Sequence, residues 1–141
     1  MGQASPTCLA FLLCESIRYD AASGKHALLG LLEDVAVPEV PTMCLDLVAY
    51  AELTGMRGRI ALGLRLTKLI PGPIRPRSAR TIATWGMSAA ILRHPDEVAK
   101  IGIQLHDVRF PEAGAYLFIL EADSIPIVAR RFTVILARSA T

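Results

Sequence analysis

A turn that leads directly into an aromatic-rich strand constrains the fold of this chain more than any other stretch. It is the segment Phe110–Glu121, which reads Phe-Pro-Glu-Ala-Gly-Ala-Tyr-Leu-Phe-Ile-Leu-Glu. Pro111 fixes φ at the entry, and Gly114 can adopt the positive φ that a tight turn needs. The residues that then share one face of the strand, at its two-residue period, are Tyr116, Phe118 and Leu120. The segment predicts a β-rich fold and points to no reaction.

Alternating apolar and polar residues recur along the chain, most clearly from Ile60 to Leu66 and again from Ile101 to Leu105. The predicted strands cover residues 8–19, 27–32, 43–53, 59–67, 81–92, 100–105, 116–121 and 127–136. Turn-forming residues separate them, and no helical periodicity is sustained. We therefore predict an all-β fold, an antiparallel β-sandwich of about seven or eight strands with an immunoglobulin-like or related topology.

The segments that connect the predicted strands also support an antiparallel β-sandwich. Two hairpins are expected, one at the turn Ala21–Lys25 and a stronger one at Ala122–Ser124. Gly30 marks a bulge or a close backbone approach, and it also interrupts the competing interpretation of Ala27–Glu33 as a short helix. The proline-containing segment Val37–Pro41 must be extended, and we expect it to carry the chain from one sheet to the other.

The length and composition of the chain predict a single domain that contacts other proteins. With 141 residues and no internal repeat, we expect a single sandwich over residues 8–138, between tails at 1–7 and 139–141. Hydrophobic residues make up 52% and charged residues only 20% of the chain. Either both sheet faces are covered or some apolar surface contacts a partner. The net charge of +2 does not favour nucleic acid as that partner.

Cysteine usage and the apolar windows bear on the compartment. Cys8, Cys14 and Cys44 are odd in number and lie in apolar runs, where a reduced thiol behaves as a small hydrophobe. This favours the cytoplasm. No apolar window approaches the roughly 20 residues that span a bilayer, and the N-terminus lacks the positive start of a secretory signal. Association with a membrane complex as a peripheral subunit stays open.

The most basic part of the chain is the Pro/Arg-rich loop at residues 71–80. Its arginines, Arg75, Arg77 and Arg80, form a candidate anion-binding site, to which His94 is a candidate addition. We favour the simpler interpretation of a solvated loop, because no glycine-rich or aromatic cradle accompanies the arginines.

No constellation of residues supports catalysis. His26, His94 and His106 are scattered, without the spacing of a zinc site, and no phosphate-binding loop or nucleophile elbow occurs. The pair His106-Asp107 could orient an imidazole, but a solvated turn is the favoured interpretation. We therefore expect no enzyme activity and no cofactor.

Charged residues on the apolar strands have structural interpretations. Glu15, Glu33 and Asp34 could form a carboxylate pair, but exposed edge charges that discourage aggregation are the favoured explanation. Arg130 and Arg131 are neighbours on the last strand, so they place one guanidinium on each face. If one is partly buried it needs a carboxylate partner, for which Glu121 is the candidate.

The arrangement Gly114-Ala115-Tyr116, after a turn and at the start of a late strand, resembles the tyrosine corner of immunoglobulin-like sandwiches. The resemblance implies that the Tyr116 hydroxyl bonds to nearby backbone. Antibody-type domains have a cysteine two residues after this tyrosine. Here Phe118 stands at that position, so core packing would replace the inter-sheet disulfide.

A wider resemblance covers most of the chain through the order of its motifs. These are Leu13-Cys14-Glu15, Gly24-Lys25, Leu29-Gly30, the prolines Pro38 and Pro41, and Phe110-Pro111-Glu112 with Gly114 and Tyr116. Together they look like a family of small, functionally uncharacterised bacterial β-sandwich domains. That family supplies no catalytic residues. The expected function is a non-enzymatic protein-interaction or assembly module, either a homo-oligomer or a peripheral subunit of a larger complex. The alternative is a small-ligand or anion-binding sandwich.

Overall fold

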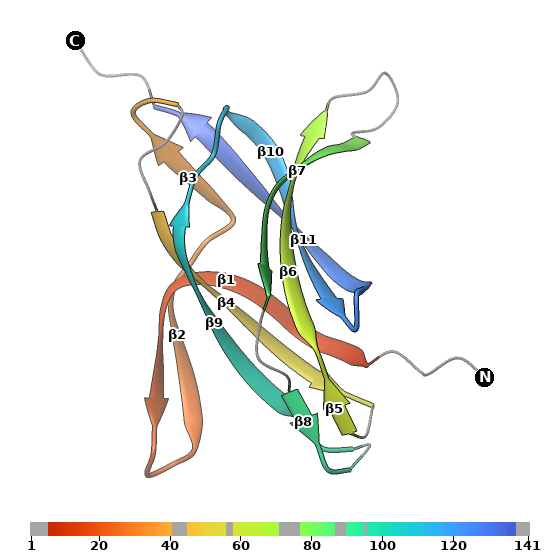
Figure 1. Cartoon of the computed structure of the whole chain (residues 1–141). Helices are drawn as coiled ribbons and strands as arrows, with labels where there is room; N and C mark the ends of the chain where they lie inside the picture. Colours follow the sequence, from red (N-terminus) through yellow and green to blue (C-terminus); the bar gives the residue numbers. More distant parts are fainter. Residues whose placement is uncertain are drawn as a thin grey trace.

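The fold was analysed in a computed structural model that describes residues 6–40, 45–55, 58–70, 77–86, 90–94 and 96–137. In these residues the regular secondary structure is entirely β (Figure 1). The strands are β1 (Thr7–Asp20), β2 (Lys25–Leu31), β3 (Asp34–Val37), β4 (Leu45–Thr54), β5 (Gly58–Ile60), β6 (Leu62–Ile70), β7 (Arg77–Gly86), β8 (Ala90–Leu92), β9 (Ala99–Val108), β10 (Gly114–Ala122) and β11 (Ile125–Leu136).

Two main sheets pack face to face. The four-stranded sheet has the order β2-β1-β4-β9, and the five-stranded sheet has the order β3-β11-β10-β6-β7. Side chains from both sheets form one core cluster, including Leu13 and Leu105 from the first sheet and Leu66 and Phe118 from the second. The predicted all-β sandwich is confirmed. The two expected hairpins are also present, as β1–β2 and β10–β11.

Two strands predicted as single elements are divided. Ala61 separates β5 from β6 because its backbone leaves the ladder and bonds to the β10–β11 turn. The Asp123 amide donates to the Ala61 carbonyl at 2.7 Å, and the Ala61 amide donates to the Asp123 carboxylate at 3.0 Å. β5 then pairs with β8, the end of the other divided strand, in a small separate sheet.

The chain crosses between the sheets before the predicted crossing as well, at the end of β2. The Leu32 amide donates to the Leu13 carbonyl in the four-stranded sheet, whereas the next residue, Glu33, accepts from the Thr133 amide in the five-stranded sheet. This earlier crossing allows β3 to pair with β11 in parallel. The predicted crossing at Val37–Pro41 begins at the end of β3, and Pro41 itself lies outside the described residues.

Aromatic side chains fill the core beneath the turn that precedes β10. Phe110, Tyr116, Phe118 and Phe132 have no exposed surface, and Trp85 lies against Phe118 with ring centroids 6.4 Å apart. Gly114 has φ +128, a conformation that side-chain-bearing residues rarely adopt. The Tyr116 hydroxyl donates to the Glu112 carbonyl and accepts from the Glu112 amide, so it ties the turn to the strand that follows it.

We expect Tyr116→Phe to lower the free energy of unfolding by about 1 kcal/mol, the usual net contribution of one hydrogen bond. The ring would keep its place in the core, and only the bonds to the Glu112 backbone would be lost. Urea titration of both proteins measures the difference. Tyr19→Phe, at an exposed tyrosine, is the control and should leave the midpoint unchanged. Equal stability of all three proteins would show that the Tyr116 hydroxyl does not stabilise the turn.

The far end of the β1–β2 hairpin folds over the outer face of the four-stranded sheet. Tyr50, on the side of β4 opposite to the core, is only 7% exposed, and the His26 ring lies 6.0 Å from it. Ile17 packs against Gly102 so closely that a Cβ there would lie 3.0 Å from its side chain. Burial, together with the hydrogen bond to Glu52, raises the pKa of Tyr50 to about 12.

This raised pKa predicts an alkaline loss of stability. The neutral Tyr50 phenol contributes to the free energy of unfolding. This contribution is fully present below the ordinary tyrosine pKa of about 10, and it is lost as the pH rises towards 12. The free energy of unfolding should therefore fall across this interval, and the fall should be smaller in Tyr50→Phe. Urea titrations at pH 9 and pH 11 measure it, with Tyr19→Phe as the matched control. If the free energy of unfolding fell equally between pH 9 and pH 11 in all three proteins, Tyr50 would not be the source of the alkaline loss.

Candidate functional site: a lateral groove between two strand edges

Both main sheets leave a strand edge open on the same side of the sandwich. β2 pairs with β1 only from Cys14 onward, and β3 pairs with β11 only from Thr133 onward. In the described part of the chain, no strand therefore lies beside Thr7–Leu13 or Ile125–Phe132 on that side. The two open edges face each other across a lateral groove, which Arg130 of β11 spans to reach the Phe11 carbonyl of β1 at 3.5 Å.

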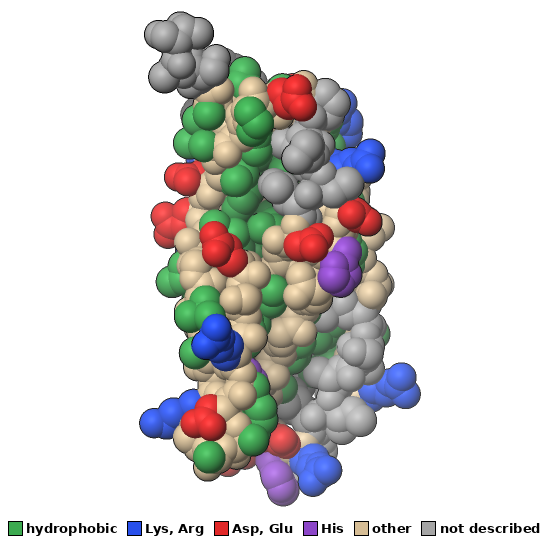
Figure 2. All heavy atoms as spheres, turned by 90° about the vertical axis from the view of Figure 1, so that its left-hand side faces the viewer, with side chains coloured by type: hydrophobic (Ala, Val, Ile, Leu, Met, Phe, Trp, Pro, Cys, Tyr) green, Lys and Arg blue, Asp and Glu red, His purple; other side chains and the backbone are tan. Residues whose placement is uncertain are grey.

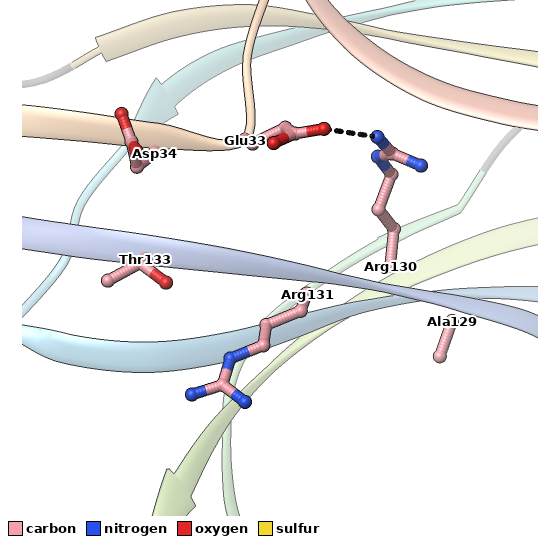
Figure 3. A pocket seen from close by; sticks show the side chains of 6 residues that line it. All are labelled: Glu33, Asp34, Ala129, Arg130, Arg131 and Thr133. Atoms are coloured by element: carbon pink, nitrogen blue, oxygen red, sulfur yellow. Dashed lines mark hydrogen bonds and ion pairs between the residues drawn. The ribbon is translucent and has the colours of Figure 1, made fainter.

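The lateral groove consists of two adjoining hollows that share Ala129 and Arg130. The first, about 430 Å³ in volume, is polar, and its other lining residues are Glu33, Asp34, Arg131 and Thr133 (Figure 3). The second, about 400 Å³, is mainly apolar, and its other lining residues are Cys8, Leu9, Ala10, Phe11, Leu12 and Val128. The groove therefore presents charged groups at one end and hydrocarbon at the other.

The two arginines of the lateral groove are incompletely paired. Arg130 has a 3.4 Å ion pair with Glu33, whose side chain is 80% exposed, so the pair contributes little. The Nε atom of Arg130 is buried without a hydrogen-bond partner. Arg131 points to the opposite side of β11 in Figure 3, and it makes no ion pair or hydrogen bond with the described residues. Of the two arginines, Arg130 is therefore the one that turns its guanidinium towards β1 and Glu33.

The structure confirms that Arg130 and Arg131 lie on opposite faces, but the predicted partner is wrong. Arg130 is opposite Phe118 on the core side, and Arg131 is opposite Leu117 on the outer side. Glu121 instead forms a 2.7 Å ion pair with Arg65 of β6. A bulge between Leu120 and Glu121 shifts the register near the hairpin end, where Glu121 pairs with Pro126 and lies well away from Arg130.

Each open edge carries features that discourage pairing with another sheet. Pro6 precedes the β1 edge and Pro126 lies within the β11 edge, so each lacks a backbone donor there. Each edge also has an irregular register, at Leu9 in β1 and at Ile127 in β11. Regular pairing along either whole edge is therefore disfavoured, and only short stretches of regular backbone remain open.

Of the predicted anion site, the structure describes the side chain of Arg80, which does not line the lateral groove. Arg75 lies outside the described residues, and of Arg77 only the backbone, in β7, is described. Arg80 forms a 2.7 Å ion pair with Glu112, and both side chains are 56% exposed. β7 is the strand of the five-stranded sheet opposite to the β3 edge. Anion binding by these arginines stays a prediction, tested by replacing Arg75, Arg77 and Arg80 with Ala.

The other candidate residues do not assemble into reactive groups. His106 lies 3.8 Å from Asp46 rather than against Asp107, and both partners of that contact are more than 60% exposed. Glu15, Glu33 and Asp34 are exposed, and Glu33 takes Arg130 as its partner. The described residues hold no cluster of three or more His, Cys, Asp or Glu side chains suited to a metal ion. No helix in this part of the chain could cross a membrane.

The Cys8 thiol lines the apolar end of the groove, and its environment makes it a poor nucleophile. Burial raises its pKa, the backbone of Ala10 only partly offsets that rise, and the nearby Glu52 adds to it. The reactive form of a cysteine is the thiolate, so the raised pKa keeps this thiol protonated at neutral pH. Cys8 is therefore not an activated nucleophile.

Sequence reasoning flagged Arg130, Arg131, Glu33 and Asp34 but did not bring them together. Their proximity depends on the parallel β3–β11 pairing, for which a four-residue strand offers no local signal. For the apolar lining, Cys8–Leu12, the sequence pattern predicts only a buried strand. A usable signal was the proline next to each open edge, which marks a strand that lacks a neighbour.

These features define the chain as a β-sandwich domain with one open side. The chain belongs to a family of unknown function, DUF6941, whose model matches residues 9–135. No curated protein matches it.

Among solved structures, the chain is similar to part of a beta-glucosidase from Listeria innocua. In the complex with gluconolactone the TM-score is 0.46 and the identity 12%, over 99% of this chain and 17% of that chain. In the complex with glucose the TM-score is 0.44 and the identity 12%, again over 99% of this chain and 17% of that chain.

Proposed function

We propose that this protein is a non-enzymatic interaction or assembly module that binds protein, either a second copy of itself or a larger complex in which it is a peripheral subunit. The observation that carries the proposal is the lateral groove, where the open backbone edges of both sheets meet an apolar lining. Open strand edges and apolar grooves are surfaces that proteins use to bind other proteins. The cytoplasm belongs to the same proposal, because Cys8 and Cys14 are free thiols.

Exposed hydrophobic side chains support the same conclusion. Figure 2, which views the side of the molecule where β2 and β3 lie in Figure 1, shows a band of hydrophobic side chains with acidic groups on both sides. Exposed hydrophobic residues on β2 are Leu29 and Leu31, and Leu9 is 54% exposed beside the lateral groove. A contiguous apolar surface with a polar border is typical of a protein-binding site.

Light scattering after size-exclusion chromatography, across a range of concentrations, tests for self-association, and affinity capture tests for a partner. For any complex found, hydrogen exchange should show added protection of backbone amides in Cys8–Leu12 and Val128–Arg131. The β7 amides, at the opposite edge of the five-stranded sheet, provide the internal control and should not change. A strictly monomeric protein that captures nothing would contradict the proposal.

A further inference from the structure

We infer that two copies of this chain pair through β2, the exposed edge strand of the four-stranded sheet, in an antiparallel arrangement about a two-fold axis. The inference goes beyond the proposed function, which places binding at the lateral groove, because β2 lines neither hollow of that groove. Three observations carry it: the unprotected edge of β2, its exposed hydrophobic side chains, and two unpaired charges that such a pairing brings together.

β2 lacks the features that protect the other sheet edges. Within the described residues, the edge strands of the two main sheets are β2, β9, β3 and β7. The last three carry exposed charged residues, which are Lys100, Asp34 and Arg80, respectively. After Lys25, by contrast, β2 contains no Asp, Glu, Lys, Arg or Pro. An edge without such residues is ready to pair with another strand.

Hydrophobic side chains follow this unprotected edge. Leu29 is 39% exposed and Leu31 is 61% exposed, and Ala27 is exposed beside them. The β1–β2 hairpin lies at the lower left margin of the molecule in Figure 1, where a second copy has access to it. Antiparallel pairing along β2 would remove these side chains from water and would also bond the open backbone groups of the strand.

The charges at the two ends of β2 favour a second copy of this chain as the partner. Lys25 begins the strand and makes no ion pair with the described residues, because its cross-strand neighbour Asp20 accepts from the Ser23 hydroxyl instead. At the other end, the Glu15 side chain lies against Gly30, where an added Cβ would be 2.7 Å from its Cδ atom. Glu15 also makes no ion pair in the described part of the chain. β2 therefore has an unpaired cation at one end and an unpaired carboxylate at the other.

Antiparallel pairing of two such strands brings the cationic end of each copy to the acidic end of the other. Gly30 has φ +68, so the regular backbone of β2 runs from Lys25 to Leu29. A two-fold axis beside Ala27, the middle of this stretch, places Lys25 of one copy opposite Leu29 of the other, next to the Glu15 carboxylate. The contact forms twice, once on each side of the axis. Parallel pairing, or a partner without this charge pattern, would not gain it.

Light scattering across a range of protein concentrations measures the dissociation constant of the dimer. Leu29→Lys puts a like charge against Lys25 of the other copy and should raise this constant about tenfold or more. Val98→Lys is the matched control, because Val98 precedes β9 and is 41% exposed, close to the 39% of Leu29. The control should dimerise as the wild type does.

A charge swap tests the antiparallel arrangement. Glu15→Lys and Lys25→Glu should each raise the dissociation constant about fivefold or more, because each turns two attractive contacts into repulsive ones. The double variant has opposite charges again and should recover most of the lost affinity. Lys100→Glu, on the edge strand at the other side of the same sheet, is the control and should have no effect. All three positions are exposed, and urea titration checks that every variant folds.

Three outcomes would overturn the inference: a monomer at every concentration, a dimer that Leu29→Lys does not weaken, or a charge swap that restores no affinity. Hydrogen exchange separates this surface from the lateral groove, because the dimer should protect amides within Lys25–Leu29. Dimer protection confined to Cys8–Leu12 and Val128–Arg131 would place the second copy in the groove, so the inference would fail while the proposed function stands. A dimer through β2 with nothing bound at the groove would keep the inference and remove the groove as a binding surface.

Discussion

Phe118→Ala should lower the free energy of unfolding by about 3–5 kcal/mol, the range measured when a fully buried aromatic residue is cut back to alanine. Phe118 has no exposed surface. Its ring lies edge-on to Phe132, with centroids 5.6 Å apart, and is stacked with Trp85 at 6.4 Å. These neighbours come from β11 and β7, so the cavity would open among side chains from three strands of the five-stranded sheet.

Urea or guanidinium titration measures this loss, with Leu117→Ala as the matched control. Leu117 precedes Phe118 on the same strand but lies half-buried on the outer face of the sheet. Its truncation removes fewer contacts and leaves no enclosed cavity, so it should cost less than half as much. If the two variants unfolded at the same midpoint, the core would not depend on the Phe118 ring.

The sequence was sufficient to predict the layers of the fold but not the edges of its sheets. Alternation identifies which residues of a strand face the core, and it did so for β6 and β9, where Leu64 and Leu105 are buried. Alternation does not identify the neighbouring strand. The parallel pairing of β3 with β11, and the crossing at Leu32 that permits it, depend on hydrogen bonds between residues about one hundred positions apart.

The same limit applies to the outer face of the four-stranded sheet. Tyr50 alternates with core alanines on β4, so its position predicts a solvated side chain. It is buried because the β1–β2 hairpin folds back and brings His26 against it. Strand curvature of this kind is set by packing against distant residues, which a local pattern does not record.

The lateral groove is a consequence of these long-range pairings. β1 and β11 are the longest strands of their sheets, and their neighbours β2 and β3 cover only part of them. The chain passes from β2 to β3 at Leu32, so both open edges begin on the same side of that crossing. The prediction that Arg130 and Arg131 lie on opposite faces followed from the strand period alone. Their position beside an open edge could not be predicted without the topology.

Gly114→Ala should lower the free energy of unfolding by about 1–3 kcal/mol, the usual cost of forcing a side-chain-bearing residue into a rare backbone conformation. Gly114 begins β10 with φ +128. A Cβ at this position would also lie 2.9 Å from the Lys68 Nζ atom. That ammonium group is buried, donates to the Leu69 carbonyl at 2.8 Å, and lies 5.2 Å from the centre of the Tyr116 ring. The substitution therefore strains the turn and pushes a buried charge away from its acceptor.

Gly86→Ala provides the matched control, because Gly86 does not have a positive φ and has open space where its Cβ would lie. It should be neutral or slightly stabilising, since alanine restricts the unfolded chain more than glycine does. Denaturant titration of both variants, repeated in a Lys68→Met background, separates the two causes of the Gly114 effect. If contact with Lys68 matters, the cost of Gly114→Ala falls in that background, whereas pure backbone strain leaves it unchanged. Equal stability of Gly114→Ala and Gly86→Ala would show that the turn before β10 does not require glycine.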